Sequence, residues 1–293
     1  MKFFIVDAFS DQLFGGNPAG VVLIEAAHDF PPTETMRLVA AELRYSETAF
    51  VKQLSESTFH TRYFTPEAEV DLCGHATIAT FHALVQAKVI VDPGEYVNQT
   101  LAGHLTISLR DGRIFMEMGR PTSLGVIQDP VAIQEIYTVL GIPERAMEIS
   151  SELLPEIIST GLPDIIVAVP DEAALAAIRP DFPALSLLSQ RYHVVGVHAY
   201  TVGGDGRFHV RNFAPLYGID EEAATGTANG ALTYYLYQRN LISDREATEF
   251  IQGEAMQRPS VVQTLIRHSD DQLTIYVGGQ AVILAQGDIS LNG

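Results

Sequence analysis

Short apolar runs rich in β-branched residues alternate along the chain with stretches whose apolar residues recur at helical spacing. The runs 3–9 (FFIVDAF) and 20–26 (GVVLIEA) predict a pair of strands, because the Gly-Gly-Asn-Pro cluster between them is typical of a turn. Residues 33–44 predict a helix, with Thr33 and Thr35 available as starting caps. The N-terminal part of the chain is therefore expected to mix strands and helices.

The order of predicted elements begins again after a break. Strand patterns fill residues 95–118, with hairpin signals at Ala102-Gly103 and Asp111-Gly112, and the stretch 119–130 (GRPTSLGVIQDP) is predicted to be a linker. Beyond it we expect helices at 131–141 and 171–180 and strands at 163–170, 193–202 and 206–215.

Two segments, 63–84 and 212–236, echo each other on a larger scale. In each, a strand with an aromatic residue and a Pro bend leads through acidic residues to a Gly that opens an Ala-rich helix. Alignment at the bend pairs Phe64 with Phe213 and Gly74 with Gly226. Two similar domains facing across a cleft is the economical explanation of this repeat.

Charge and cysteine content limit the classes of partner. The chain has 36 acidic against 18 basic residues, a formal net charge of -18, and no basic stretch, so a nucleic-acid partner is not expected. The single Cys73 cannot form an internal disulfide, which favours a cytoplasmic location. The run 3–9 is too short for a signal peptide or a membrane span, so no membrane association is expected.

Gly74 and Gly226 place small residues at the starts of the two matching helices. The first N–H groups of a helix have no intrahelical partner, and the helix dipole is positive there, so such a start can bind an anion. A single start is more often a helix end without a ligand. Two matching starts favour one shared site for an anionic substrate in a chain with few basic residues.

Glu47 lies between a predicted helix and the apolar strand that begins at Thr48. A carboxylate in this position suits a general base that must later return a proton, although spacing alone favours a solvated turn glutamate. His75 follows Gly74, where an imidazole can stabilise negative charge or relay a proton. A lone His is more often structural.

A second acidic group precedes the second helix. Glu222, within the cluster that begins at Asp220, is a candidate second acid/base, although acids there commonly just stabilise the helix start. Thr225 and Thr227 are candidate caps or hydrogen-bond donors to a substrate. Cys73 is a candidate nucleophile or base, with a buried unreactive thiol the commoner case. The His residues show no HExxH or paired ligand spacing, so no metal site is expected.

Together these motifs carry a family resemblance over nearly the whole chain. The segments are FFIVDAF, GGNPAGVVL, SETAFV, EVDLCGHATIAT and RNFAPLYGIDEEAATGTANGAL, in that order. The sequence resembles the PhzF-like (phenazine biosynthesis) family of the diaminopimelate epimerase superfamily. Any one of these motifs is loose, whereas the set in this order is specific.

The resemblance implies an α+β protein of two similar domains, each a mixed β-sheet rolled around a central helix, with the active site in the cleft between them. We expect domains over residues 1–119, completed by 279–293, and 120–278. The resemblance also implies a homodimer, the absence of a cofactor, and a small carboxylated metabolite as the substrate.

Residue by residue, the resemblance places the family's catalytic glutamate on Glu47 and its histidine on His75. Glu222 stands where an aspartate is usual and Thr227 where a serine is usual, which puts the phenazine precursor itself in doubt as the substrate. The two opposed cysteines of the superfamily's epimerases fall on Cys73 and Thr225, so a racemase with two bases is disfavoured.

The resulting hypothesis is an isomerase that moves a proton on a small carboxylated substrate, with Glu47 as general acid/base. His75 and Glu222 would complete the catalytic group, and the substrate would be bound at Gly74, Gly226, Thr227, Cys73 and Thr225. Two alternatives remain: a binding protein of the same fold without catalysis, and an epimerase-like enzyme that depends on the Cys73 thiol.

Overall fold

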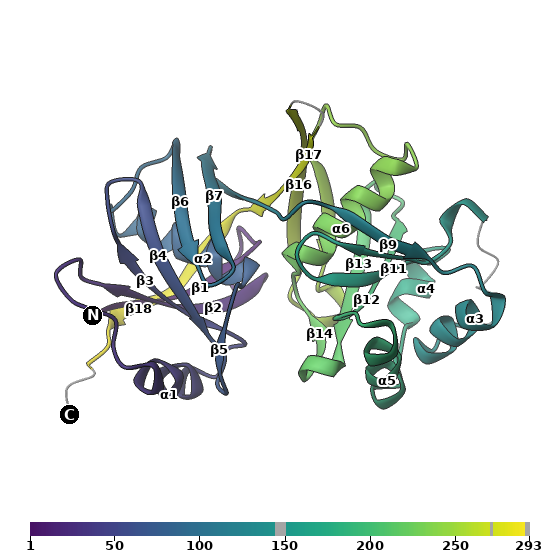
Figure 1. The fold of residues 1–293 in the computed structure, drawn as a ribbon, viewed down its shortest axis with the longest axis horizontal. Helices are drawn as coiled ribbons and strands as arrows, with labels where there is room; N and C mark the ends of the chain where they lie inside the picture. The colour runs from purple at the N-terminus through teal and green to yellow at the C-terminus, as the bar shows by residue number, and fades with distance from the viewer. Residues whose placement is uncertain (144–150, 270–271, 291–293) are drawn as a thin grey trace. The chain divides into compact units, whose positions relative to one another are not determined.

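The computed structural model describes residues 1–143, 151–269 and 272–290 (Figure 1). The chain divides into two compact units, unit 1 formed by residues 1–117 and 278–293, and unit 2 formed by residues 118–277. In the part of the chain that the structure describes, no helix has both the length and the apolar character needed to cross a membrane.

Unit 1 is built from strands that enclose one helix, α2 (Gly74–Gln86), which packs on β1, β2, β3, β8 and β18 (Figure 1). Because α2 is rich in Ala and Thr and is buried on almost every side, strands can surround it closely. The other elements are β1 (Lys2–Ala8), β2 (Asn17–Ile24), α1 (Thr33–Leu43), β3 (Thr48–Gln53), β4 (Thr58–Phe64), β5 (Glu69–Val70), β6 (Gly94–Thr100), β7 (Gly103–Arg110), β8 (Arg113–Glu117) and β18 (Ala281–Asp288).

Unit 2 repeats this plan around α6 (Gly226–Gln238), which packs on β10, β11 and β16. An outer apolar core joins helices α3 and α5 to the other face of the sheet, with Tyr137, Leu185 and Phe213 among its buried members. The other elements of unit 2 are β9 (Thr122–Val126), α3 (Pro130–Val139), η2 (Ser151–Leu153), β10 (Glu156–Ser159), β11 (Pro163–Ala168), α4 (Glu172–Ala177), α5 (Phe182–Tyr192), β12 (Gly196–Val202), β13 (Phe208–Ala214), η3 (Pro215–Tyr217), β14 (Ile219–Glu222), β15 (Thr248–Gln252), η4 (Glu254–Met256), β16 (Ser260–Ser269) and β17 (Gln272–Gly279).

The two units have the same strand order. In unit 1 the pairs β1–β2, β3–β4, β4–β5 and β6–β7 are antiparallel, and β2–β3 and β4–β6 are parallel. In unit 2 the corresponding pairs, from β10–β11 to β15–β16, have the same directions. This match confirms the α+β fold of two similar domains, each a mixed sheet around a central helix.

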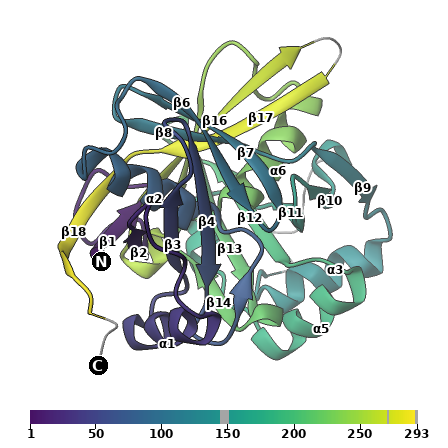
Figure 2. The ribbon, with the colours of Figure 1, turned by 60° about the vertical axis from the view of Figure 1, so that its left-hand side comes forward.

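The chain crosses between the two units twice, from β8 to β9 and from β17 to β18. After β8 of unit 1 the chain enters unit 2 as β9, which pairs with β10. After β17 it returns as β18, which is drawn in yellow in Figure 2 and pairs with β1. Two strand pairs therefore depend on segments far apart in the sequence.

Two expectations about local structure were wrong, and one helix was not predicted. The predicted linker 119–130 contains β9, and the pattern analysis missed α5, whose helix starts at Asp181 with Pro183 in its first turn. Thr33 does not cap α1: the helix starts after Pro32 without a side-chain cap, and the Thr33 hydroxyl accepts a hydrogen bond from Arg62.

The acidic turns that follow the two matching strands are held by matching arginines. The guanidinium of Arg62 donates two hydrogen bonds to Glu69, at 2.7 and 2.6 Å, and that of Arg211 donates two to Glu221, at 2.8 and 2.7 Å. Each arginine also lies over the aromatic ring two residues further on, Phe64 or Phe213. Glu221 is therefore a structural member of the acidic cluster at 220–222.

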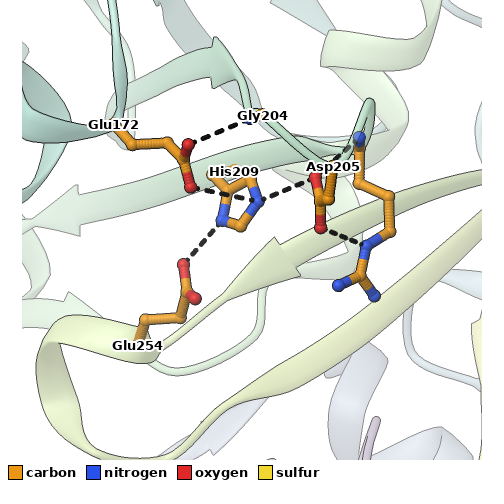
Figure 3. A network of polar contacts seen from close by, with 6 residues as sticks. Glu172, Gly204, Asp205, His209 and Glu254 are labelled. Carbon is orange, nitrogen blue, oxygen red and sulfur yellow. Dashed lines mark hydrogen bonds and ion pairs between the residues drawn. The ribbon is translucent and has the colours of Figure 1, made fainter.

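A buried histidine joins three surface segments of unit 2 (Figure 3). The His209 ring lies 2.7 Å from Glu254 through Nδ1, and 3.3 Å from Asp205 and 3.6 Å from Glu172 through Nε2. Burial acts to lower the pKa of His209, but Glu254 and Asp205 outweigh it, so the pKa is raised above the usual 6.5. The His209 ring thus links α4, the β12–β13 turn and η4.

This arrangement predicts a dependence of stability on pH. A histidine with a raised folded-state pKa contributes stability below its unfolded-state pKa and loses that contribution as the pH rises through the folded-state value. We expect His209→Asn to lower the free energy of unfolding more at about pH 6 than at about pH 9, measured by urea denaturation. His104→Asn, at an exposed position, is the matched control. Equal losses for His209→Asn at both pH values would contradict the interpretation.

Candidate active site

The start of α2 forms the base of the candidate site in unit 1. Cys73 occupies the N-cap position with extended backbone angles, and its side chain makes no capping hydrogen bond. The first intrahelical bonds run to the Cys73 carbonyl, from the backbone N–H of Thr77 at 3.0 Å and from its hydroxyl at 2.7 Å. The amides of the first turn, from Gly74 onward, therefore lack a side-chain cap and remain suited to an anion.

Glu47 is held at the start of β3. Its backbone carbonyl accepts a hydrogen bond from Gly20 of β2 at 3.3 Å, and the next residue, Thr48, begins the parallel pairing of β3 with β2. Its side chain is only 13% exposed. The predicted alternative of a solvated turn glutamate does not describe this buried carboxylate.

His75 lies at the centre of a polar cluster in unit 1. Its Nε2 is 3.2 Å from Glu47 Oε2 and 3.3 Å from the Ser46 hydroxyl. Its Nδ1 is 3.2 Å from the Asn17 side-chain amide nitrogen and 3.4 Å from the Cys73 sulfur. The structure thus brings together Glu47, Cys73 and His75, which are separated by up to 28 positions in the sequence.

The environment of His75 determines which nitrogen carries its proton. Burial lowers the pKa of His75, and the nearby Glu47 carboxylate opposes this only in part, so the ring is neutral near pH 7. An amide NH₂ group can only donate, so the orientation of the Asn17 amide, with Nδ2 facing Nδ1, fits the tautomer that carries its proton on Nε2, toward Glu47.

The Glu47 oxygen Oε2 is buried, and it receives no well-directed hydrogen bond from the residues that the structure describes. It lies within ion-pair distance of His75 Nε2, but the geometry does not qualify as a hydrogen bond. A buried carboxylate oxygen without a donor is an unusual feature, because such acceptors are normally paired. This oxygen has a lone pair available for a proton.

The matching helix start in unit 2 has a different set of side chains. The Thr225 hydroxyl lies 2.6 Å from Glu222 Oε2 and does not cap α6, which corrects the expectation of a capping role. Gln252 donates to the Glu222 carbonyl at 2.9 Å and accepts from the Thr225 amide at 3.1 Å. Asn229 donates to the Thr225 carbonyl at 2.9 Å. Glu222, Thr225, Gly226 and Thr227 therefore lie together, within unit 2.

Two buried titratable residues of unit 2 escaped the sequence analysis. Asp164 is 1% exposed, and burial raises its pKa to about 7, although Asn212 donates a hydrogen bond to it at 3.4 Å. His198 is fully buried, and burial lowers its pKa to about 3. Both lie within apolar strands, where the hydrophobic pattern gives no signal of a partly polar interior.

Strand register shows what unit 2 has in place of Glu47. Thr48 is opposite Phe64 in unit 1, and Val197 is opposite Phe213 in unit 2, so the residue that corresponds to Glu47 is Gly196. A Cβ atom at Gly196 would collide with the Phe213 carbonyl oxygen. In the same alignment Thr225 and Thr227 replace Cys73 and His75, so the acid, thiol and imidazole cluster occurs in unit 1 alone.

A cavity of about 710 Å³ lies in unit 2 and includes none of the predicted site residues. The guanidiniums on its wall are already engaged, since Arg211 binds Glu221 and Arg179 donates to the carbonyls of Ala176 and Ile178. Volume alone therefore does not make this cavity a stronger candidate than the cluster around His75.

Asn17 and Ser46 contact His75 but were absent from the predicted site. The sequence analysis assigned GGNPAG to a turn, but only Gly15 and Gly16 precede β2, which Asn17 begins, and Asn17 directs its amide to the histidine. Both residues stand inside or beside motifs that were identified, so position within a motif was the only available signal.

Comparison with known proteins identifies the family. Residues 6–287 match the PhzC-PhzF family, described as phenazine biosynthesis-like protein. The chain belongs to this family. It is an isomerase, as are the curated relatives, which include the uncharacterized isomerase YddE of Salmonella typhimurium, 33% identical over 95% of each chain.

Two further relatives place the chain in the same group. The trans-2,3-dihydro-3-hydroxyanthranilate isomerase of Pseudomonas fluorescens is 30% identical over 99% of each chain. A crystal structure of the Bacillus anthracis phenazine biosynthesis protein of the PhzF family, 24% identical, superposes over 99% of each chain with a TM-score of 0.86. The resemblance found in the sequence is therefore confirmed, and the structural match supports the fold.

Asp164 generates a prediction about stability. An acid whose folded-state pKa is raised destabilises the fold as the pH rises from its unfolded-state pKa toward the folded value of about 7. Asp164→Asn cannot ionise, so its free energy of unfolding should exceed that of the wild type increasingly between about pH 4 and pH 7, by up to a few kcal/mol. Asp11→Asn, at an exposed position, is the control. A constant difference across this range would refute the assignment.

Proposed function

We propose that this isomerase moves a proton within a small carboxylated substrate and that Glu47 is its general acid/base. The observation that carries the proposal is the buried Oε2 of Glu47, which accepts no well-directed hydrogen bond from the described residues and lies beside an uncapped helix start. Such an oxygen can take a proton from a substrate held at that helix start, and can return it.

The substrate carboxylate is proposed to bind at the first turn of α2. The amides that follow Cys73 have no side-chain cap, and the helix dipole adds a partial positive charge at this end. This mode of binding suits a chain with a formal net charge of -18, because it needs no cluster of Lys or Arg. The same amides stabilise negative charge that develops on the substrate in the transition state.

The proposed reaction has two steps. First, Glu47 accepts a proton from a carbon next to a carboxylate or a double bond, and the electron pair of the broken C–H bond spreads into that conjugated system. Then the protonated carboxyl group of Glu47 returns the proton to another carbon on the same face of the substrate. Nothing is oxidised or reduced, so the step is balanced without a cofactor. The neutral His75, with its proton on Nε2, orients the carboxylate.

The difference between the two units supports a mechanism with one base. Glu47 corresponds to Gly196, where no side chain fits, and Cys73 and His75 correspond to threonines. A racemase needs a group on each face of the substrate, whereas a proton shift on one face needs a single group. The roles of Glu222, Thr225, Gly226 and Thr227 in substrate binding remain predictions from the family resemblance.

The name of one relative indicates the class of substrate. The Pseudomonas fluorescens enzyme isomerises trans-2,3-dihydro-3-hydroxyanthranilate, a carboxylated ring. We propose a small carboxylate for this chain also, but not that compound, because Glu222 and Thr227 depart from the family motif. Screening small unsaturated carboxylic acids for uptake of deuterium from D₂O, by NMR, is the direct way to find it.

Glu47→Gln should abolish turnover and solvent-hydrogen exchange while leaving ligand binding and thermal stability nearly unchanged. Glutamine keeps the size of the side chain but cannot accept the proton, and general acid-base catalysis contributes about a hundred- to ten-thousand-fold. Deuterium uptake by a substrate that the wild type exchanges is the measurement.

Glu42→Gln, on the exposed side of α1, is the matched control and should exchange at the wild-type rate. Glu222→Gln is the informative comparison, because it removes the other predicted carboxylate. If Glu47→Gln exchanges at nearly the wild-type rate and Glu222→Gln does not, Glu222 is the base and the proposal is wrong.

One observation favours a second candidate function, an enzyme that depends on the Cys73 thiol. The Cys73 sulfur lies 3.4 Å from His75 Nδ1, within reach of proton transfer to the imidazole. If Glu47 is the only base, we expect Cys73→Ala to lower turnover by less than about tenfold, well below the loss from removing a general base. A loss of several orders of magnitude, with the fold intact by circular dichroism, would establish the thiol mechanism instead.

A further inference from the structure

Three side chains of unit 1 present a carboxylate, a thiol and an imidazole to one point. One ligand atom from each of Glu47, Cys73 and His75 lies within 4.8 Å of the other two. We propose that these residues bind a divalent transition-metal ion of the Zn²⁺ class, with a fourth position open to water or a substrate carboxylate, and that the bound ion inhibits the enzyme.

The separations match those between the ligands of one tetrahedral ion. Zinc binds nitrogen and oxygen at about 2.0–2.2 Å and sulfur at about 2.3 Å, which places N and O about 3.4 Å apart and N and S about 3.6 Å apart. In unit 1, His75 Nε2 is 3.2 Å from Glu47 Oε2 and 3.8 Å from Cys73 Sγ. Both separations lie within a few tenths of an ångström of these values, and the third, between Cys73 Sγ and a Glu47 oxygen, is within 4.8 Å.

The buried Glu47 oxygen is an independent indication of a ligand. It receives no hydrogen bond within the described part of the chain, although it is buried. A metal ion would satisfy this acceptor. The thiolate, imidazole and carboxylate together favour zinc over magnesium or calcium, which prefer oxygen ligands alone.

The surroundings can support metal binding through Nε2. That mode moves the imidazole proton to Nδ1, which then needs an acceptor. Asn17 lies 3.2 Å from Nδ1 and can offer its side-chain oxygen after a turn of the amide. Cys73 must lose its thiol proton to solvent, so the affinity should rise with pH.

The His209 cluster of unit 2 is the natural rival and serves as a control (Figure 3). Its carboxylates are divided between the two ring nitrogens, with Glu254 on Nδ1 and Asp205 and Glu172 on Nε2. It contains no sulfur, and the three-ligand grouping found in the described residues is the one in unit 1. A metal at His209 would also have to displace its existing contacts.

Inhibition follows from the position of the ion and rests on the proposed function. The oxygen of Glu47 that would bind the metal is the oxygen proposed to accept the substrate proton. An ion bound there removes the free lone pair and occupies the space at the start of α2. Zn²⁺ should therefore compete with the substrate.

The test uses the full chain, without an affinity tag, titrated with Co²⁺ as a spectroscopic substitute for Zn²⁺. We expect binding of one ion per chain, with visible absorption of a tetrahedral site and a near-ultraviolet thiolate-to-metal band, both removed by Zn²⁺. Cys73→Ala should abolish the near-ultraviolet band and weaken binding at least about tenfold, since loss of outer-shell partners alone costs about 10–100-fold. His209→Asn should leave both bands unchanged.

A second variant covers the case in which Cys73→Ala does not fold. Glu47→Gln should weaken Co²⁺ binding while keeping the thiolate band. Absence of saturable binding, bands that survive loss of the thiol, or bands that disappear in His209→Asn would each overturn the metal site. These spectra need no substrate, so they are independent of the proposed function.

Inhibition is then measured on the wild type with a substrate found by deuterium exchange. Zn²⁺ should raise the apparent KM linearly with its free concentration, with the inhibition constant equal to the dissociation constant of Zn²⁺ measured by displacement of Co²⁺. Full exchange activity with the site saturated would overturn the inhibition and leave the isomerase assignment intact. Conversely, metal binding with no exchange on any carboxylate would count against the proposed function alone.

Discussion

The enclosure of a whole helix by a sheet is the constraint on which the rest of each unit depends. A helix buried on almost every side needs many small residues so that strands can approach, and its hydroxyl groups need hydrogen-bond partners. In α2 the hydroxyls of Thr77 and Thr80 bond to the carbonyls four residues earlier, both at 2.7 Å, and in α6 Thr233 does the same at 2.8 Å. These hydroxyl groups along the sides of the helices are therefore already hydrogen-bonded. The helix start remains, where Cys73 leaves the first amides without a side-chain cap and where the side chains of neighbouring loops gather.

The two units share one plan but differ at the start of the central helix. Strand directions, the ion pairs Arg62–Glu69 and Arg211–Glu221, and the length of the central helix agree in the two units. These features hold the sheet around its helix. The side chains at the helix starts do not hold the sheet around the helix, and they differ between the units. Unit 1 has Glu47 with a thiol and an imidazole, and unit 2 has Gly196 with two threonines. The Gly196 backbone approaches Phe213 so closely that a carboxylate cannot be restored there without a shift of the strand. The asymmetry is therefore built into the backbone as well as the side chains.

Much of the fold could be predicted from the sequence, because alternating apolar runs, Gly-opened helices and the Phe-x-Pro bend are local signals. The failures have physical causes. Strand β9 was assigned to a linker because its side chains are exposed, so its order comes from pairing with β10, about 30 residues further along unit 2, which no local pattern records. The site was foreseen only in part. Glu47 and His75 were identified through the family resemblance, whereas Asn17 reaches His75 by folding across 58 positions.

The buried Glu47 oxygen connects the proposed catalysis with the proposed inhibition by a metal ion. In the proposed mechanism, a base that accepts a proton from carbon cannot have its lone pairs occupied by fixed donors, and Oε2 is buried without a well-directed hydrogen bond from the described residues. The imidazole of His75 is a second metal-binding group, with its Nε2 3.2 Å from this oxygen, and the N-cap thiol of Cys73 is a third. The geometry that suits the proposed transfer of a proton also suits the proposed binding of a Zn²⁺-class ion. Replacement of the thiol by a hydroxyl, as at Thr225 in unit 2, removes the strongest metal ligand and keeps the backbone of the helix start, so the tendency to bind metal depends on one sulfur atom.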